Sequence, residues 1–349
     1  MSLYLPLGIL VLSGFLAISS VAPALFYLQL VWILLGTLII FSFRFFDWRV
    51  LVNYRWVTGG LYALSIFLLL AAFFGGHIVR GTRSWIVLGP VNFQPVELVK
   101  VALILLFAGY FSRRHLKIAS KEVIFTSFLF FLIPAALVMI QPDLGSTILL
   151  FGIWFGLLVF SGLSGKRLLF AVASIALVLV ISWFYVFKDY QRARIVGLFY
   201  PERDVLGINY SVAQSKIAIG SSGFWGKGYR QGSQGQLGFL TEPQSDFVLS
   251  VVLEEWGVFG GLVVISAFVA LIVGILSVGL NAQKNFEKFI CLGTAIVFSL
   301  QFLLNGGSTL GLTPVIGLPF PFVSYGGSNI VMSFFLFSFI NAIKRTKYY

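Results

Sequence analysis

Long runs of apolar residues, separated by short polar or charged stretches, follow one another from the beginning of the chain to its end. A helix needs roughly 20 apolar residues to cross the hydrocarbon core of a bilayer. By this criterion the sequence predicts ten membrane-spanning helices, at residues 3–21, 24–43, 56–74, 95–111, 124–140, 144–162, 168–187, 247–279, 286–304 and 328–343. We therefore expect an all-α polytopic membrane protein in which residues 1–349 form a single integral membrane domain.

The apolar run at 247–279 is longer than one span requires. Its front part, residues 247–255, contains Glu254 and Glu255, and carboxylates are costly in hydrocarbon. We expect this part to lie at the membrane surface and the span to begin near Gly257. The first run, 3–21, has no Lys or Arg before it and no clear cleavage site, so it is expected to be a retained helix rather than a signal peptide.

Composition supports this assignment, since 59% of the 349 residues are hydrophobic and only 10% are charged. The net charge of +12 could suggest a nucleic-acid partner, but the positions of the charges give another explanation. Basic residues gather after the even-numbered spans, at Arg44, Arg49, Arg55, Arg113, Arg114, Lys117, Lys121, Lys166, Arg167, Lys284, Lys288, Lys344, Arg345 and Lys347. The positive-inside rule places these connections and both termini in the cytoplasm, so no nucleic acid is expected.

The remaining connections, at 75–97, 141–146, 188–246 and 305–327, are then extracytoplasmic. The connection at 188–246, between the seventh and eighth spans, has roughly 59 residues, several times the usual loop length. Such a large extracytoplasmic loop is expected to be functional or to contain short helices of its own.

The scarcity of histidine and cysteine excludes several chemistries. His77 lies on the outer side and His115 on the inner side, so no Ser-His-Asp triad or Cys/His metal site can be built, and Cys291 is the only cysteine. The glycine-rich stretch 220–228 lacks the GxxxxGK[ST] spacing of a nucleotide loop. Its glycines either form turns or present backbone amides to a substrate phosphate.

Carboxylates remain as candidates for acid or base chemistry. Glu97 and Lys100 are three residues apart in an apolar helix, where they share a face and can form an ion pair that lines a polar cavity. Asp143 precedes the sixth span and could cap it. Asp246 precedes the eighth apolar run, where it could either cap a helix or act as a general base.

These motifs, in this order, resemble the SEDS family (shape, elongation, division and sporulation proteins). The matching stretches lie at 81–85, 93–100, 141–145, 192–195, 214–215, 223–228, 240–257, 311–314 and 319–328. The sequence Gly226-Lys-Gly228 followed by Gly232-Ser-Gln234 resembles the RodA branch of the family, with the FtsW or sporulation branch as the alternative.

The chain also departs from the family pattern. Gln244 stands where relatives commonly have histidine, and Ser84 stands before Trp85 where arginine is usual. Arg83 is displaced from that position by one residue, which leaves its role open. Val96 replaces a serine in the block at 93–100, and residues 305–308 differ from the usual NIGM.

The resemblance implies a ten-helix fold and a peptidoglycan glycosyltransferase that polymerises lipid II, the undecaprenyl-diphosphate-linked precursor, on the outer face of the bacterial inner membrane during elongation. It also implies a class B penicillin-binding protein, a transpeptidase, as partner. Lipid diphosphate as leaving group makes a nucleotide unnecessary, while its charge requires Arg, Lys or a divalent cation such as Mg²⁺ or Mn²⁺. The candidate cations are Arg192, Arg194, Lys216 and Lys227, and Asp246 is the candidate base for the acceptor hydroxyl.

Two other functions stay open at this point. A flippase for the lipid-linked precursor would need charged groups accessible from both membrane faces, whereas the unusual polar residues of this chain gather on one side. A non-catalytic scaffold for the penicillin-binding protein would leave the block around Asp246 unexplained.

Overall fold

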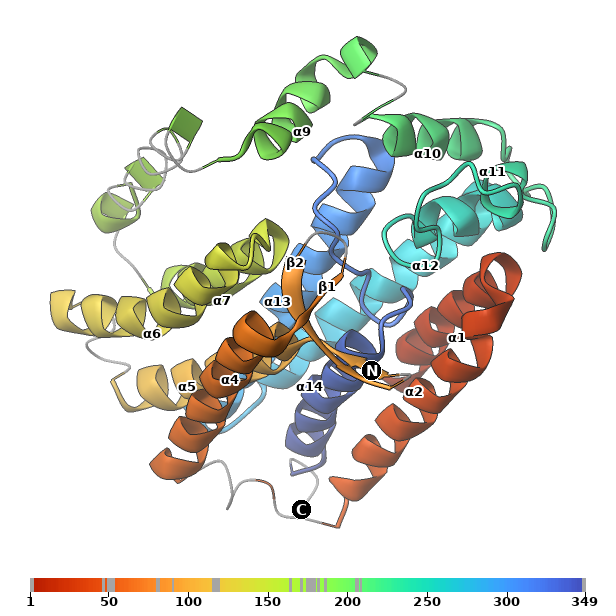
Figure 1. Cartoon of the computed structure of the whole chain (residues 1–349). Coiled ribbons are helices and arrows are strands. Elements are labelled where there is room, and N and C mark those ends of the chain that lie inside the picture. Colours follow the sequence, from red (N-terminus) through yellow and green to blue (C-terminus); the bar gives the residue numbers. More distant parts are fainter. Residues whose placement is uncertain are drawn as a thin grey trace.

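The structure is a computed structural model of the chain. It describes residues 3–346 apart from residues 46–47, 49–53, 80–81, 90, 115–119, 163–164, 170–171, 174–179, 181–182, 185–186, 205–206 and 208. Elongated helices pack into a bundle, and shorter helices cover one end of it (Figure 1).

Eight helices of the described part are long and apolar enough to cross a membrane. They are α1 (Tyr4–Val21), α2 (Pro23–Ser42), α4 (Arg55–Gly75), α5 (Pro95–Arg113), α6 (Lys121–Ile140), α12 (Val248–Leu280), α13 (Asn285–Leu310) and α14 (Gly327–Thr346). A ninth apolar helix, α7 (Leu144–Phe160), is shorter. Each of the nine coincides with a predicted span, which confirms a predominantly helical membrane fold. The remaining predicted span, 168–187, falls largely outside the described residues.

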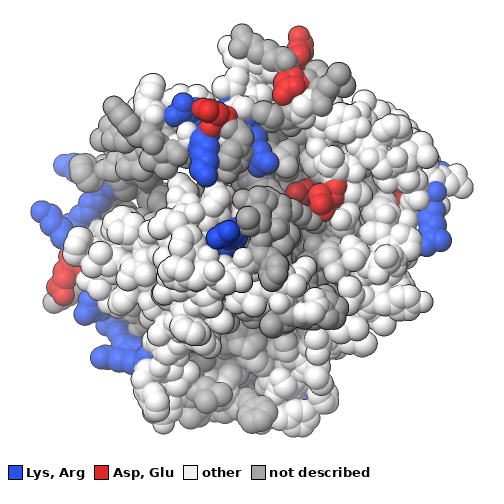
Figure 2. Space-filling model, viewed as in Figure 1, with Lys and Arg blue, Asp and Glu red and all other residues white. Residues whose placement is uncertain are grey.

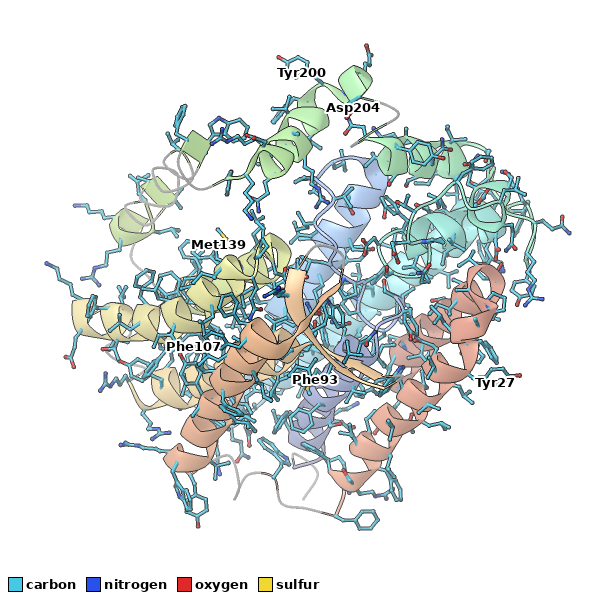
Figure 3. The ribbon with its side chains drawn as sticks, viewed as in Figure 1. Tyr27, Phe93, Phe107, Met139, Tyr200 and Asp204 are labelled. Atoms are coloured by element: carbon cyan, nitrogen blue, oxygen red, sulfur yellow. The ribbon has the colours of Figure 1, made fainter. Side chains whose placement is uncertain are left out.

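Helix α5 lies at the centre of the bundle, where α4, α7, α13 and α14 contact it. Small residues such as Ala102 and Ala108 are fully buried and allow close helix approach. On the exterior of the bundle, side chains are expected to contact lipid tails instead of other helices. Tyr27 on α2 projects outward, whereas Phe107 on α5 lies within the bundle (Figure 3). The largely uncharged surface in Figure 2 agrees with contact to lipid.

The connection between α4 and α5 is not helical. It forms a small antiparallel sheet of β1 (His77–Val79), β2 (Thr82–Leu88) and β3 (Val91–Phe93), in the order β1-β2-β3. Ile86 pairs with Phe93 in this sheet, and the Ser328 hydroxyl donates to the Asn92 carbonyl, which ties β3 to the start of α14 (3.1 Å). The sequence pattern did not predict this sheet, so the fold is helical with one small sheet.

Helix α12 is kinked at Gly257, whose φ of 67° and ψ of −169° are not helical. The kink agrees with the expectation that the span begins there. It frees backbone groups of α12 for the glycine-rich loop: the Lys227 amide donates to the Glu254 carbonyl (2.9 Å) and the Val258 amide to the Gly223 carbonyl (3.1 Å). A Cβ atom on Gly226 would lie 2.2 Å from the Glu255 carbonyl oxygen, so these glycines permit close backbone contact. Gly223, Gly226 and Gly228 also have positive φ, as expected of turn glycines in the stretch 220–228.

The connection at 188–246 contains its own short helices, as expected from its length. They are α9 (Asp189–Phe199), the 3₁₀ turn η1 (Pro201–Asp204), α10 (Tyr210–Gly220) and α11 (Ser233–Gln236). Helices α9 and α10 lie at the end of the bundle where α13 ends (Figure 1), and α10 contacts both α12 and α13.

We expect the connection at 188–246 to face the extracytoplasmic side. Leu237 is a suitable site for a cysteine because it is 69% exposed, whereas the Ser233 hydroxyl contacts Lys227 and Glu254. The native Cys291 is buried and should not react. A membrane-impermeant maleimide should therefore label Leu237→Cys in spheroplasts. Labelling only after the inner membrane has been permeabilised would show that this connection is cytoplasmic.

Candidate functional site

Asp246 lies directly before α12, on the walls of two cavities. The smaller cavity has a volume of about 360 Å³ and the larger about 740 Å³, sizes typical of small-molecule sites. Polar residues of the smaller wall include Arg194, Glu202, Asn209, Ser211, Lys216, Thr241 and Thr313. Polar and aromatic residues of the larger wall include Thr82, Trp85, Gln94, Asp143, Lys188, Gln191, Tyr325, Ser328 and Asn329.

Five residues belong to the walls of both cavities: Arg194, Asp246, Thr313, Pro314 and Val315. The Arg194 guanidinium donates to the Val315 carbonyl (2.8 Å), which holds its charge at the division between the cavities. The Asp246 carboxylate and the Arg194 guanidinium therefore lie at the boundary between the two cavities.

Asp246 is not the N-cap residue of α12, since that position belongs to Phe247. The backbone of Asp246 is nevertheless fixed, since its amide donates to the Glu242 carbonyl (3.1 Å) and its carbonyl accepts from the Asn305 amide nitrogen (3.0 Å). Gly317 lies beside the carboxylate, because a Cβ there would be 3.8 Å from Asp246 Oδ2.

Glu97 and Lys100 form the predicted ion pair. Lys100 Nζ lies 2.7 Å from Glu97 Oε2, and the two residues are 3% and 4% exposed. The Asn329 amide donates to Glu97 Oε2 (3.1 Å). Since Asn329 lines the large cavity, the pair lies behind the wall of the cavity, with Asn329 between them.

Asp143 caps α7, one of the roles considered for it. Its carboxylate accepts from the Ser146 amide (2.9 Å) and hydroxyl (2.7 Å), and also from Gln94 Nε2 (3.2 Å). Burial raises the pKa of the Asp143 carboxyl, although the hydrogen bonds from Ser146 act to lower it. Gln94 and Asp143 together form a polar part of the large cavity wall.

The four candidate cations occupy different places. Arg194 and Lys216 line the small cavity with Asp246. Arg192 donates to the Phe184 carbonyl (3.1 Å) and lies 3.9 Å from Asp189, and Lys227 Nζ lies 2.8 Å from Glu254 Oε1. Neither Arg192 nor Lys227 lines either cavity.

Glu254 and Glu255 are both 1% exposed and hold the glycine-rich loop in place. Glu254 accepts from Lys227 and from the Gln234 amide (3.0 Å). Glu255 accepts from the Ser20 hydroxyl at the end of α1 and from the Arg230 amide (3.3 Å). These carboxylates therefore join α1, α12 and the loop at 223–236.

Some site residues were not singled out by the sequence. Asn305, Ser324 and Tyr325 contact the backbone of residues 244–246. Asn305 ends an apolar run, which marks it as an unusual buried amide but does not reveal its partner.

Arg83, whose role was open, is exposed and lines neither cavity. Among the described residues no three His, Cys, Asp or Glu side chains gather as metal ligands, and His115 lies outside these residues.

The sequence matches a protein family named FtsW/RodA/SpoVE and described as "Cell cycle protein", over residues 4–349. It is 39% identical over 272 residues to the peptidoglycan glycosyltransferase MrdB of Escherichia coli, covering 78% of this chain and 73% of that protein. It is 36% identical over 277 residues to a probable peptidoglycan glycosyltransferase FtsW of Haemophilus influenzae, covering 78% and 69%.

Solved structures share the fold across almost the whole chain. The rod shape determining protein RodA of Thermus thermophilus matches with a TM-score of 0.74 and 27% identity, covering 99% of this chain and 97% of that one. A chain from a structure described as "Structural coordination of polymerization and crosslinking by a peptidoglycan synthase complex" matches with a TM-score of 0.85, 29% identity and the same coverage.

Proposed function

Because this chain belongs to the FtsW/RodA/SpoVE family of cell cycle proteins, we infer that it is a peptidoglycan glycosyltransferase of the RodA type. The relatives named MrdB and FtsW carry that activity in their names, and the fold matches RodA over 99% of the chain. Nothing in these matches favours the FtsW branch, since the MrdB relative has the higher identity of the two.

The substrate proposed for the two cavities is lipid II. In the reaction, a sugar hydroxyl of the acceptor attacks the anomeric carbon of the donor, the bond from that carbon to the diphosphate oxygen breaks, and the hydroxyl loses its proton. Asp246 accepts this proton as general base. The observation that carries the assignment is that Asp246 lines both cavities, because donor and acceptor must meet at the base.

Arg194 and Lys216 are the proposed contacts of the leaving diphosphate. Both line the small cavity with Asp246, and fixed cations near a developing negative charge stabilise the transition state. Arg192 and Lys227, the other sequence candidates, line neither cavity and pair with the carboxylates of Asp189 and Glu254 instead.

A divalent cation, Mg²⁺ or Mn²⁺, is compatible with the small cavity. Mg²⁺ commonly binds one or two carboxylates together with substrate phosphates, and Asp246 and Glu202 are carboxylates of this wall. When bound, the cation would supply charge neutralisation for the diphosphate. No nucleotide is required, because cleavage of the lipid diphosphate bond drives the transfer.

The proposed location is the bacterial inner membrane, with a class B penicillin-binding protein as the partner that crosslinks the new strands. Support comes from the similarity to a chain of a peptidoglycan synthase complex that coordinates polymerization and crosslinking. The residues that line the two cavities come from connections predicted to be extracytoplasmic and from adjacent helix ends. This one-sided placement favours a polymerase over a flippase, which needs access from both faces.

We expect Lys216→Gln to weaken binding of undecaprenyl diphosphate about tenfold. A hydrogen bond to a charged group contributes about 1.5–3 kcal/mol, and 1.4 kcal/mol corresponds to a factor of about ten. Binding to the detergent-solubilised protein can be measured by microscale thermophoresis. The matched control is Lys284→Gln, which removes a lysine from the connection between α12 and α13. Equal affinities of the two variants would exclude Lys216 as a diphosphate contact.

A further inference from the structure

Asn305, near the end of α13, contacts the segment that carries Asp246. Its side-chain nitrogen lies 2.8 Å from the Leu318 carbonyl oxygen, 3.0 Å from that of Asp246 and 3.5 Å from that of Ser245. Asn305 is 2% exposed, so these contacts form without competition from water.

The orientation of this amide is determined by its surroundings. An amide NH₂ group has two hydrogens to donate, while the amide oxygen can only accept. Rotating the amide by 180° would place Oδ1 against three carbonyl oxygens, which is electrostatically unfavourable. Asn305 Oδ1 is buried, with no hydrogen-bond partner among the described residues. The NH₂ group therefore makes the hydrogen bonds of this side chain to the described residues.

Two further hydrogen bonds hold the same segment. The Ser324 hydroxyl donates to the Ser245 carbonyl (2.6 Å) and accepts from the Phe320 amide (2.9 Å). The Tyr325 amide donates to the Gln244 carbonyl (2.8 Å). The carbonyl groups of residues 244, 245 and 246 are thus each bound to α13 or to the connection at 311–326.

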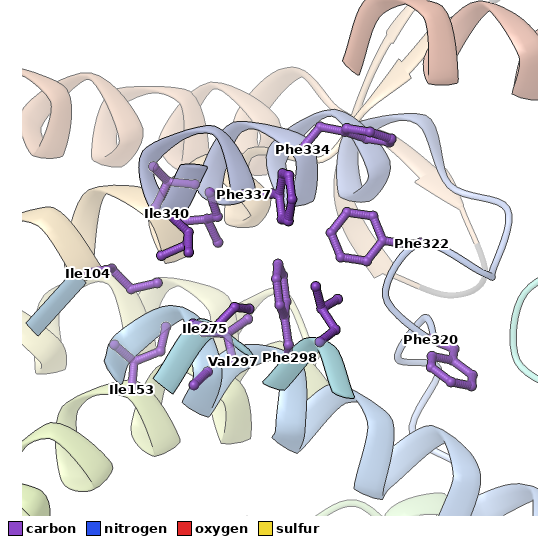
Figure 4. Packing of buried hydrophobic residues seen from close by; sticks show 14 of the residues in the cluster. Ile104, Ile153, Ile275, Val297, Phe298, Phe320, Phe322, Phe334, Phe337 and Ile340 are labelled. Carbon is purple, nitrogen blue, oxygen red and sulfur yellow. The ribbon is translucent and has the colours of Figure 1, made fainter. Parts of the chain in front are cut away.

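That connection is itself fixed in the core of the bundle. Phe320, Phe322 and Val323 are at most 2% exposed. The Phe322 ring lies between those of Phe298 on α13 and Phe334 on α14, with centroids 5.2 and 5.5 Å away (Figure 4). The backbone behind Asp246 is therefore held by a well-packed core, while its side chain faces the cavities.

We propose that Asn305 is a positioning residue that holds the backbone of Asp246 so that its carboxylate stays at the division between the two cavities. The proposal rests on the proposed function, in which Asp246 is the general base. Catalysis depends steeply on such placement, because a displacement of about 1 Å can reduce the rate on the order of 10²-fold. Rigid support of a catalytic group by buried hydrogen bonds is the usual means of achieving this precision.

The test compares kcat and KM of Asn305→Ala with those of the unaltered protein in a lipid II polymerisation assay. We expect kcat to fall at least tenfold while KM changes less than twofold, because the cavity walls that bind substrate remain in place. Asn341→Ala is the matched control: Asn341 is also buried, at 8% exposure, and accepts from the Tyr4 hydroxyl far from the cavities. We expect this control to keep the kcat and KM of the unaltered protein.

Ser324→Ala tests the same support without creating a large void, since it removes only the hydroxyl that binds the Ser245 carbonyl. We expect it to lower kcat at least threefold with KM unchanged. A normal kcat in folded Asn305→Ala, or in Ser324→Ala if Asn305→Ala does not fold, would overturn the proposal. The proposed glycosyltransferase activity would then still stand, because that activity fails only if the unaltered protein does not polymerise lipid II.

Discussion

Replacing Asp246 by asparagine should reduce polymerisation of lipid II by about 10²–10⁴-fold, the usual contribution of a general base. Asparagine keeps the size of the side chain but cannot accept the proton of the acceptor hydroxyl. Since Phe247 and not Asp246 is the N-cap residue of α12, and Asn305 binds the backbone carbonyl of Asp246, the substitution should leave the fold intact. The measurement is the amount of glycan polymer formed from lipid II by the purified variant.

Asp189→Asn is the matched control for this experiment. Asp189 belongs to the same connection, but its side chain is fully exposed and lies outside both cavities. This control should polymerise at the normal rate, and both variants should keep the melting temperature of the unaltered protein. If Asp246→Asn were well folded and polymerised at a nearly normal rate, Asp246 would not be the general base.

Replacing Lys100 by methionine should destabilise the protein by about 3–5 kcal/mol. This is the typical cost of removing one partner of a buried ion pair, because the other charge is left without compensation. Glu97 would remain with the Asn329 amide as a hydrogen-bond donor but without the ammonium 2.7 Å away. We expect a lower melting temperature and reduced polymerisation, since Asn329 forms part of the cavity wall.

The double variant Glu97→Gln/Lys100→Met separates charge from packing. Removing both charges leaves no uncompensated charge in the bundle, so the double variant should recover part of the stability lost in Lys100→Met. Thermal unfolding in detergent, followed by tryptophan fluorescence, measures the difference. Normal stability and normal polymerisation in both Lys100→Met and Glu97→Gln would show that the pair is dispensable.

The apolar pattern was sufficient to predict most of the fold. A span of about 20 apolar residues is a strong local signal, because the bilayer requires it, and nine predicted spans coincide with helices. The break at Gly257 was also predictable, since Glu254 and Glu255 cannot lie in hydrocarbon without a reason. The sheet at 77–93 was not predicted, because strands of three to seven residues are too short to give a clear period.

The candidate site was predictable in part. The pairing of Glu97 with Lys100 follows from the cost of charge near lipid and from spacing on a helix. The choice of Asp246 as the base rests on the resemblance to the SEDS family and stays a prediction. The sequence could not separate Arg194 and Lys216 from Arg192 and Lys227, because burial of Glu254 determines the place of Lys227 through tertiary contacts. Asn305 was missed for the same reason, since its partner Asp246 is 59 residues away in the chain.

The most direct test uses the purified chain in liposomes with lipid II, alone and with a class B penicillin-binding protein. We expect the unaltered protein to form glycan polymer in at least one of these mixtures, and Asp246→Asn to form about 10²–10⁴-fold less in the same mixture. Transport of lipid II across the liposome membrane without polymer formation by the unaltered protein would contradict the assignment and identify a flippase.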